Sequence, residues 1–208
     1  MLTTLLLASG RIDELAGNMA RDLENAGPRT GELLIQQLRG FSTYPDKAAV
    51  RRLFDQLTTA YPALAEAHLV RAQGAFGVKD TAGAMAETDK ALELQPSSEL
   101  AALLKASLLP DAAAQLDYLQ GFLAANPKAN DVRLGYARVL VAEKKYDVAR
   151  SEFQKLLKAS PDNPDVLFAV GILSLQLNDV TEAERQLKRF VAIGHGKIVA
   201  ARNYLGQI

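Results

Sequence analysis

The chain has 208 residues, of which 49% are hydrophobic and 23% are charged, a globular composition long enough for one or two domains. Lys+Arg and Asp+Glu each total 24, and this balance excludes the bulk electrostatics of a dedicated nucleic-acid-binding protein. The absence of cysteine excludes disulfides and thiolate chemistry. The two histidines, His68 and His195, are too few for a metal site made of histidines.

Amphipathic segments follow one another along the chain and predict an all-helical protein. Apolar spacing and flanking breaker residues predict helix pairs near 1–8/12–26, 29–41/46–60, 64–77/81–94, 97–108/111–125, 130–142/146–159 and 163–177/180–193, with a final helix at 197–208. Three helix starts depend on particular residues, namely Asp111 as an N-cap, Asn163 as an N-cap before Pro164, and a capping box from Thr181 to Glu184. The apolar run at the start is too short to span a membrane and lacks the features of a signal peptide. No later run reaches spanning length, so we expect no membrane insertion by this segment.

Prolines recur at a nearly constant interval and indicate an internal repeat. Pro28, Pro62, Pro96, Pro127 and Pro161 are separated by 34, 34, 31 and 34 residues, and His195 occupies the next position. Small residues also recur in pairs that are 12 apart, in Ala72/Ala84, Ala137/Ala149 and Gly171/Ala183. A period of 34 with small residues in both halves is typical of two closely packed antiparallel helices per unit.

These features resemble the tetratricopeptide repeat (TPR) family. The resemblance implies an all-α, right-handed superhelix of antiparallel helix pairs, with about six repeats plus a final helix. We expect one array over residues 1–208, with units near 1–30, 31–64, 65–95, 96–129, 130–163 and 164–198, and a half unit or cap at 199–208. The last stretch, AARNYLGQI, looks like the opening half of another repeat, and we therefore expect a fragment of a longer chain.

In this family the first helix of each pair lines a concave groove that holds a peptide, a helix or another protein's surface. Counting from the start of each unit, the resemblance implies that the groove is lined by Ile35, Arg39, Leu69, Gln73, Phe76, Leu100, Leu104, Leu134, Arg138, Val141, Phe168, Ile172 and Leu175. The alternative for each apolar residue is a place in the core. The alternative for Arg39 and Arg138 is a salt bridge to a neighbouring helix. The fifth positions of the first helices carry no Lys or Asn, which argues against the chaperone-type repeats that clamp a C-terminal carboxylate.

The sequence shows no arrangement that predicts catalysis or a cofactor. His68 lacks a second ligand at metal-binding spacing and is expected to be structural. The GHGK stretch at 194–197 lacks the spacing of a phosphate-binding loop, and no serine stands in a nucleophile elbow. We therefore expect a protein that is not an enzyme.

One stretch, DVRLGYARVLVAEKKYDVARSEFQKLLKASPDNPDVLFAVGIL, has a narrower resemblance. Its Arg133-Leu134-x-Tyr136-Ala137-Arg138 run and Ala149-x3-Phe153 are similar to a group of proteobacterial TPR proteins. That group includes outer-membrane lipoproteins that act as adaptors for a periplasmic carboxy-terminal processing protease. The resemblance implies a protease or assembly partner on the periplasmic side of a bacterial envelope, although the lipid-bearing cysteine of such proteins is absent here.

Two functions remain open at this point. The first is a scaffold or adaptor that binds a partner protein in the concave groove. The second is a structural module that forms homo-oligomers through its terminal helices at 1–8 and 197–208. The sequence itself names neither the partner nor the compartment, and a cytoplasmic location stays open beside a periplasmic one.

Overall fold

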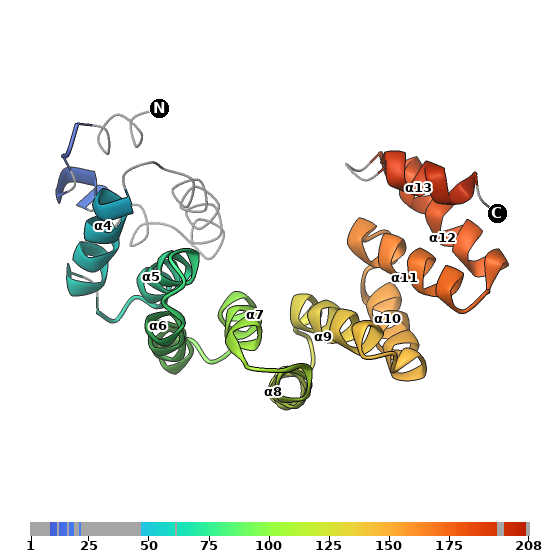
Figure 1. The fold of residues 1–208 in the computed structure, drawn as a ribbon, viewed down its shortest axis with the longest axis horizontal. Coiled ribbons are helices and arrows are strands. Elements are labelled where there is room, and N and C mark those ends of the chain that lie inside the picture. The colour runs from blue at the N-terminus through green and yellow to red at the C-terminus, as the bar shows by residue number, and fades with distance from the viewer. Residues whose placement is uncertain are drawn as a thin grey trace. The chain divides into compact units, whose positions relative to one another are not determined.

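The computed structural model describes residues 9–11, 13–15, 17, 18, 21, 47–60, 62–194 and 198–206 (Figure 1). These residues form α-helices and turns, and no strand occurs among them. The chain divides into two compact units, Met1–Leu108 and Leu109–Ile208. The expected helices at 1–8 and 29–41 lie outside the described residues. The few described positions inside the expected helix at 12–26 are helical.

The described helices follow the predicted pairs closely. The first unit contains α4 (Lys47–Ala60), α5 (Ala65–Gly77), α6 (Thr81–Leu94) and α7 (Glu99–Leu108). The second unit contains α8 (Ala112–Ala125), α9 (Asn130–Ala142), α10 (Tyr146–Ala159), α11 (Pro164–Gln176), α12 (Val180–Ile193) and α13 (Ile198–Leu205). The all-α fold of antiparallel helix pairs is therefore confirmed. The prediction of one continuous array over the whole chain stays a prediction.

Helix starts are fixed by side chains that accept from the free N–H groups of the first turn. Asn163 accepts from the N–H groups of Asp165 and Val166, with Pro164 as the first helical residue. Asp111 caps α8 by accepting from Ala114 N at 2.8 Å. Both predicted caps are confirmed.

The predicted capping box at Thr181 is wrong. The helix α12 begins at Val180, as its predicted bounds of 180–193 require, but its N-cap is Asp179, whose carboxylate accepts from the N–H of Glu182. Thr181 consequently lies inside the helix rather than before it.

The same turn closes three of the helix pairs. Lys79, Lys144 and Asn178 have φ angles of 64°, 60° and 58°, which place each in the left-handed region after the first helix. The next N–H then donates back across the turn, from Asp80 to Ala75 O, Lys145 to Leu140 O and Asp179 to Ser174 O, at 2.8–2.9 Å. Asp80 and Asp179 go on to cap the second helix, whereas Lys145 makes no side-chain capping bond. This turn sets the angle at which each second helix returns.

Small residues stand where paired helices meet, as their spacing predicts. Ala72, Ala84, Ala137, Ala149 and Ala183 are all fully buried, and α5 packs on α6, α9 on α10 and α11 on α12. At Gly171 an added Cβ would lie 2.8 Å from both Cγ and Cδ2 of Leu187. The two helices therefore approach more closely than any larger side chain at Gly171 permits.

Candidate functional site

In the compact unit Met1–Leu108, the first helices of two repeats, α5 and α7, carry part of the predicted groove surface. Leu69 on α5 is buried, Gln73 is half-buried and Phe76 is 48% exposed. On α7, Leu100 and Leu104 are half-buried. Ile35 and Arg39 lie outside the described residues. Of these positions, Phe76 offers the most surface to a partner, and Leu69 serves the core of its own hairpin.

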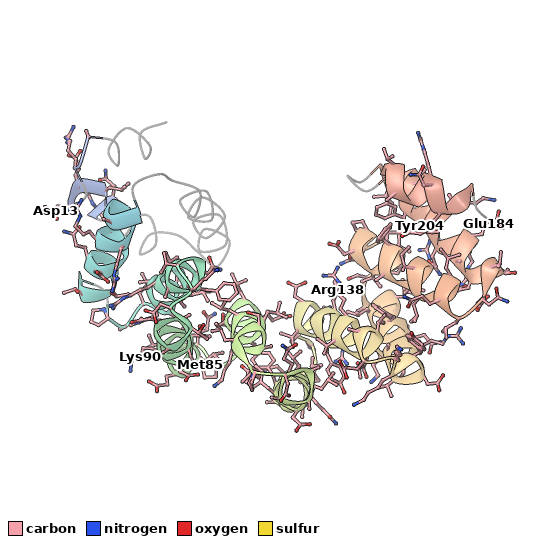
Figure 2. All side chains as sticks on the ribbon, viewed as in Figure 1. Asp13, Met85, Lys90, Arg138, Glu184 and Tyr204 are labelled. Carbon is pink, nitrogen blue, oxygen red and sulfur yellow. The ribbon has the colours of Figure 1, made fainter. Side chains whose placement is uncertain are left out.

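In the second unit the first helices α9 and α11 lie against each other. Leu134 is buried, Val141, Ile172 and Leu175 are half-buried, and Arg138 is exposed. Figure 2 shows Arg138 projecting from α9. The half-buried residues give this face an apolar surface that no described helix fully covers.

Phe168 on α11 is the exception on that face. Its ring centroid lies 5.2 Å from that of Phe190 and 6.5 Å from that of Tyr204. It packs with them on a buried cluster formed by Leu167, Leu187, Phe190 and Ala201. Phe168 therefore joins α11, α12 and α13, and its removal would damage this packing.

One ion pair crosses the face between α9 and α11. Arg138 Nη2 lies 3.6 Å from Asp165 Oδ1, and about half of each side chain is exposed. A pair at this distance and exposure contributes little to stability. The arginine can thus turn away from Asp165 at small cost. The salt-bridge alternative for Arg138 is observed, and its contact with a partner stays a prediction.

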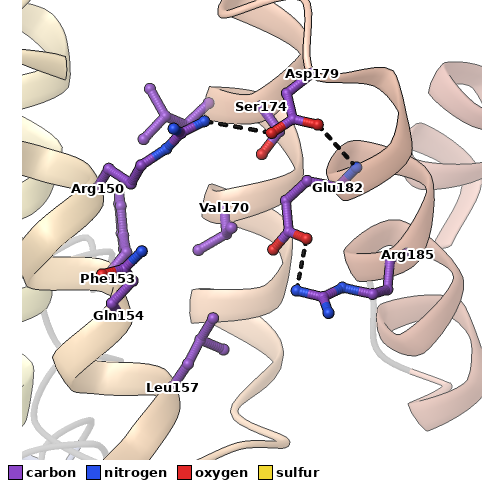
Figure 3. Close-up of a pocket in the computed structure, with 10 residues that line it drawn as sticks. Arg150, Phe153, Gln154, Leu157, Val170, Ser174, Asp179, Glu182 and Arg185 are labelled. Atoms are coloured by element: carbon purple, nitrogen blue, oxygen red, sulfur yellow. Dashed lines mark hydrogen bonds and ion pairs between the residues drawn. The ribbon is translucent and has the colours of Figure 1, made fainter. Parts of the chain in front are cut away.

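A pocket of about 260 Å³ lies elsewhere in the second unit, between α10, α11 and α12 (Figure 3). Phe153, Leu157, Val170 and Leu173 supply its apolar wall. The charged groups around it pair with one another, Arg150 with Asp179 at 3.3 Å and Arg185 with Glu182 at 2.5 Å. None of the predicted groove residues lines it. Sequence reasoning missed this pocket because its residues come from three helices and carry no motif on any of them.

Comparisons with known proteins bear directly on this architecture. Two family models, both described as Tetratricopeptide repeat, match residues 101–164 and 140–201. A thermophilic TPR protein of Thermus thermophilus is similar in structure, with 15% identity, a TM-score of 0.63, and 85% of this chain and 97% of that chain covered.

The chain is a tetratricopeptide repeat protein. Such repeats are in general non-enzymatic scaffolds for protein–protein interaction. The structure of YrrB, described as a TPR protein with an unusual peptide-binding site, is also similar, with 17% identity, a TM-score of 0.55, and 82% of this chain and 89% of that one covered.

A curated relative matches over a short stretch. Cellulose synthase operon protein C of Pseudomonas fluorescens is 38% identical over 52 residues. The match spans 25% of this chain but only 4% of that protein. The similarity is limited to this stretch of 52 residues.

Two of the TPR repeats make the same polar contact at equivalent positions. His68 bonds the carbonyl of Pro62, six residues before it, and the carboxylate of Glu87, 19 residues after it. Arg133 bonds the carbonyl of Pro127 and the carboxylate of Glu152 at the same two separations. The prediction that His68 is structural is confirmed. We call this contact the proline latch, because it connects the proline turn that ends one repeat to the helix pair of the next repeat.

The latch of the second unit surrounds a buried carboxylate. Burial alone would raise the pKa of Glu152, but hydrogen bonds from Lys155 and Arg133 outweigh it and hold this pKa below its usual value. The two donors lie 2.6 Å and 2.5 Å from the carboxylate oxygens. Glu152 is therefore a charged structural residue, held ionised by its partners.

Among the residues that the structure describes, no group of three or more His, Asp or Glu side chains could hold a metal ion. Likewise, no described helix combines the length and apolar character needed to cross a membrane.

Proposed function

We propose that the chain is a scaffold or adaptor that binds a partner protein along the face formed by α9 and α11. The observation that carries this proposal is the half-buried apolar surface of Val141, Ile172 and Leu175 next to the loosely paired Arg138. Partly exposed apolar side chains beside a reorientable charge are suited to a helix or extended segment laid on a groove. The peptide-binding site in the description of YrrB adds support, because that protein has the same fold.

The finer proposal concerns the kind of partner. We propose a protease or an assembly factor on the periplasmic side of a bacterial envelope. The support is the similarity of residues 131–173 to adaptor-type TPR lipoproteins, and the 52-residue similarity to a protein named for a cellulose synthase operon.

A charge reversal on the face tests the adaptor. The wild-type chain and an Arg138→Glu variant are used side by side to capture proteins from a bacterial envelope extract. Lys158→Glu makes the same change of charge on an exposed position of α10 and serves as the matched control. Circular dichroism checks that all three chains are folded.

We expect a protein that the wild type and Lys158→Glu retain and Arg138→Glu loses, and whose binding is reproduced with the purified protein. Equal capture by all three chains would remove the support for this face. Arg138→Glu is the better probe than Phe168→Glu, because Phe168 packs on Phe190 and Tyr204.

The alternative, homo-oligomer formation through the terminal helices, is tested with the same protein. Val199 on α13 is 73% exposed, whereas Tyr204 packs on Phe168. Val199→Glu therefore probes the outer surface of α13 without disturbing its packing. A concentration-dependent dimer in light scattering that this change splits would favour self-assembly over the adaptor.

A further inference from the structure

The pocket between α10, α11 and α12 lies beside a position that carries a long side chain in the other repeats whose first helix is described. Val170, which lines the pocket, stands nine residues after Pro161. The residue at the same distance after the earlier proline turns, or after His195 in the last repeat, is Arg71, Lys105, Tyr136 or Tyr204. Valine on α11 is therefore the short member of this series.

In the compact unit Met1–Leu108 this long side chain reaches back to the preceding helix. Arg71 on α5 pairs with Asp55 on α4 at 3.1 Å. Lys105 on α7 likewise pairs with Asp89 on α6, at 2.6 Å. Each acid stands seven residues before the proline that ends its repeat. The pair therefore bridges the second helix of one repeat and the first helix of the next, and it occupies part of the space between them.

A tyrosine takes this position in the repeats on either side of α11. Burial, followed by the charges of Glu152 on α10 and Asp117 on α8, raises the pKa of Tyr136, so its hydroxyl lies within reach of both flanking helices. On α13, the ring of Tyr204 packs with that of Phe168. Both neighbouring repeats thus pack an aromatic ring at the position where α11 carries a valine.

Between α10 and α11 the bridging pair is replaced by a pocket. The position seven residues before Pro161 is Gln154, and both Gln154 and Val170 line the pocket (Figure 3). The volume of about 260 Å³ exceeds that of an apolar cavity of roughly 150 Å³, which takes up benzene. The pocket therefore has room for one aromatic ring.

A buried serine in this pocket has a hydroxyl without a partner. Ser174 lines the pocket and is 3% exposed, and no described residue hydrogen-bonds its hydroxyl. The equivalent residue of the preceding repeat, 34 positions earlier, is the buried Leu140. Buried hydroxyls are ordinarily hydrogen-bonded, and leaving one without a partner is unfavourable. Ser174 therefore favours an occupant that carries a hydrogen-bonding group.

The rim of the pocket carries two ion pairs whose charges cancel. Arg150 pairs with Asp179 at 3.3 Å, and all or part of both side chains is open to solvent. Arg185 pairs with Glu182 at 2.5 Å and is also partly exposed. Since both arginines already have an acidic partner, the rim does not favour an anion such as a phosphate or a carboxylate. The same groups can donate to and accept from the main chain of a peptide, so a neutral ring on a peptide suits this pocket.

We propose that the pocket binds the side chain of a tyrosine on a partner protein. The ring lies on the apolar wall, and the phenolic hydroxyl bonds Ser174. The partner thus supplies the ring that Tyr136 and Tyr204 supply in the neighbouring repeats. A tyrosine, rather than a free phenol, is the source because TPR repeats are in general scaffolds for protein–protein interaction. This contact is separate from the α9–α11 face and does not depend on it.

Titration of the whole isotope-labelled chain with N-acetyl-tyrosinamide, followed by nuclear magnetic resonance, tests the proposal. We expect saturable shifts of the amide signals of Phe153, Val170 and Ser174. N-acetyl-phenylalaninamide is the matched probe without the hydroxyl. Ser174→Ala should weaken binding of the tyrosine probe about fivefold, the usual effect of one hydrogen bond, and leave binding of the phenylalanine probe unchanged. The absence of saturable shifts in the wild type, or an equal effect of Ser174→Ala on both probes, would overturn the proposal.

A third probe, p-cresol, separates the two sources of a phenol, because it has the atoms of the tyrosine side chain without a main chain. Binding of both p-cresol and N-acetyl-tyrosinamide is expected for a pocket that takes a partner's tyrosine. Binding of p-cresol alone would overturn the assignment to a protein and make a free phenol the ligand.

Filling the pocket from within provides the decisive variant. Val170→Tyr introduces the residue of the neighbouring repeats and should abolish binding of the tyrosine probe, while circular dichroism shows an unchanged helical content. Val148→Tyr is the matched control and should keep binding, because Val148 is 47% exposed and does not line the pocket. If Val170→Tyr does not fold, Ser174→Leu, which copies Leu140, serves instead. Binding retained by the folded, filled variant would overturn the proposal. Arg138→Glu should leave this binding unchanged, so that the pocket and the α9–α11 face are judged separately.

Discussion

Replacing Gly171 with alanine is expected to weaken the pair α11–α12, although alanine is the better helix former. Alanine in a helix interior gains about 1 kcal/mol over glycine. Here, however, the new Cβ would lie 2.8 Å from both Cγ and Cδ2 of Leu187. Carbon atoms in good contact are roughly 3.5–4.0 Å apart, so the helices must separate or Leu187 must leave its rotamer.

The size of this effect follows from two opposing terms. Overpacking a tight core costs about 1–3 kcal/mol, which exceeds the propensity gain of about 1 kcal/mol. We expect a net loss of about 1 kcal/mol in the local free energy of opening. That loss corresponds to a roughly fivefold fall in the hydrogen-exchange protection of α11 and α12.

A double-mutant cycle with Leu187→Ala isolates the cause. With Cγ and Cδ2 of Leu187 removed, the Gly171→Ala change should instead raise protection, since only the propensity term remains. Gly121→Ala on α8 is the matched control, because an added Cβ there meets nothing within 4 Å, and it should stabilise its helix by about 1 kcal/mol. The same effect of Gly171→Ala in both backgrounds would refute the reasoning from close approach.

Further predictions concern caps and ionisable groups in the second unit. Lys145→Asp should stabilise α10 by about 1 kcal/mol, because it supplies the capping carboxylate that Asp80 and Asp179 supply to their helices; an unchanged urea midpoint would contradict this. The lowered pKa of Glu152 means that its contribution is complete above the ordinary pKa of a glutamate and is lost as the pH falls through the lowered value. Glu152→Gln should therefore flatten the fall of the thermal midpoint between about pH 5 and pH 3, the range around the ordinary glutamate value. Burial, followed by the charges of Glu152 and Asp117, raises the pKa of Tyr136, so Tyr136→Phe should reduce the loss of stability when alkali takes the pH above the ordinary tyrosine value.

The sequence predicted the helix pairs well because their signals are local. Prolines stop helices, Asn163 and Asp111 start them, and small residues mark close approaches. The bounds of α12 were predicted correctly, but its N-cap was not, because two possible acceptors, Asp179 and Thr181, lie within three residues of each other. The left-handed backbone of Asn178 places Asp179, rather than Thr181, at the N-cap position. That backbone conformation cannot be predicted from residue types alone.

The candidate site was predicted less completely because exposure depends on neighbouring helices. Leu69, Leu134 and Phe168 stand at the same position of their first helices, yet the first two are buried and the third packs on two aromatic rings. Position on a helix indicates which face a residue shares. How far the next helix covers that face follows from packing between units, which no periodicity specifies.

The proline latch also bears on how such chains change by exchange of whole repeats. Its acceptor is a main-chain carbonyl, of Pro62 or Pro127, and the side chain that bonds it differs, His68 in one repeat and Arg133 in the other. The carbonyl of Pro161 accepts instead from Arg189, on the second helix of the next repeat. A repeat moved behind a new neighbour therefore finds the same acceptor whatever side chains that neighbour carries. Only the incoming repeat has to bring the donor, and this makes the boundary after each proline turn the natural place to cut and join.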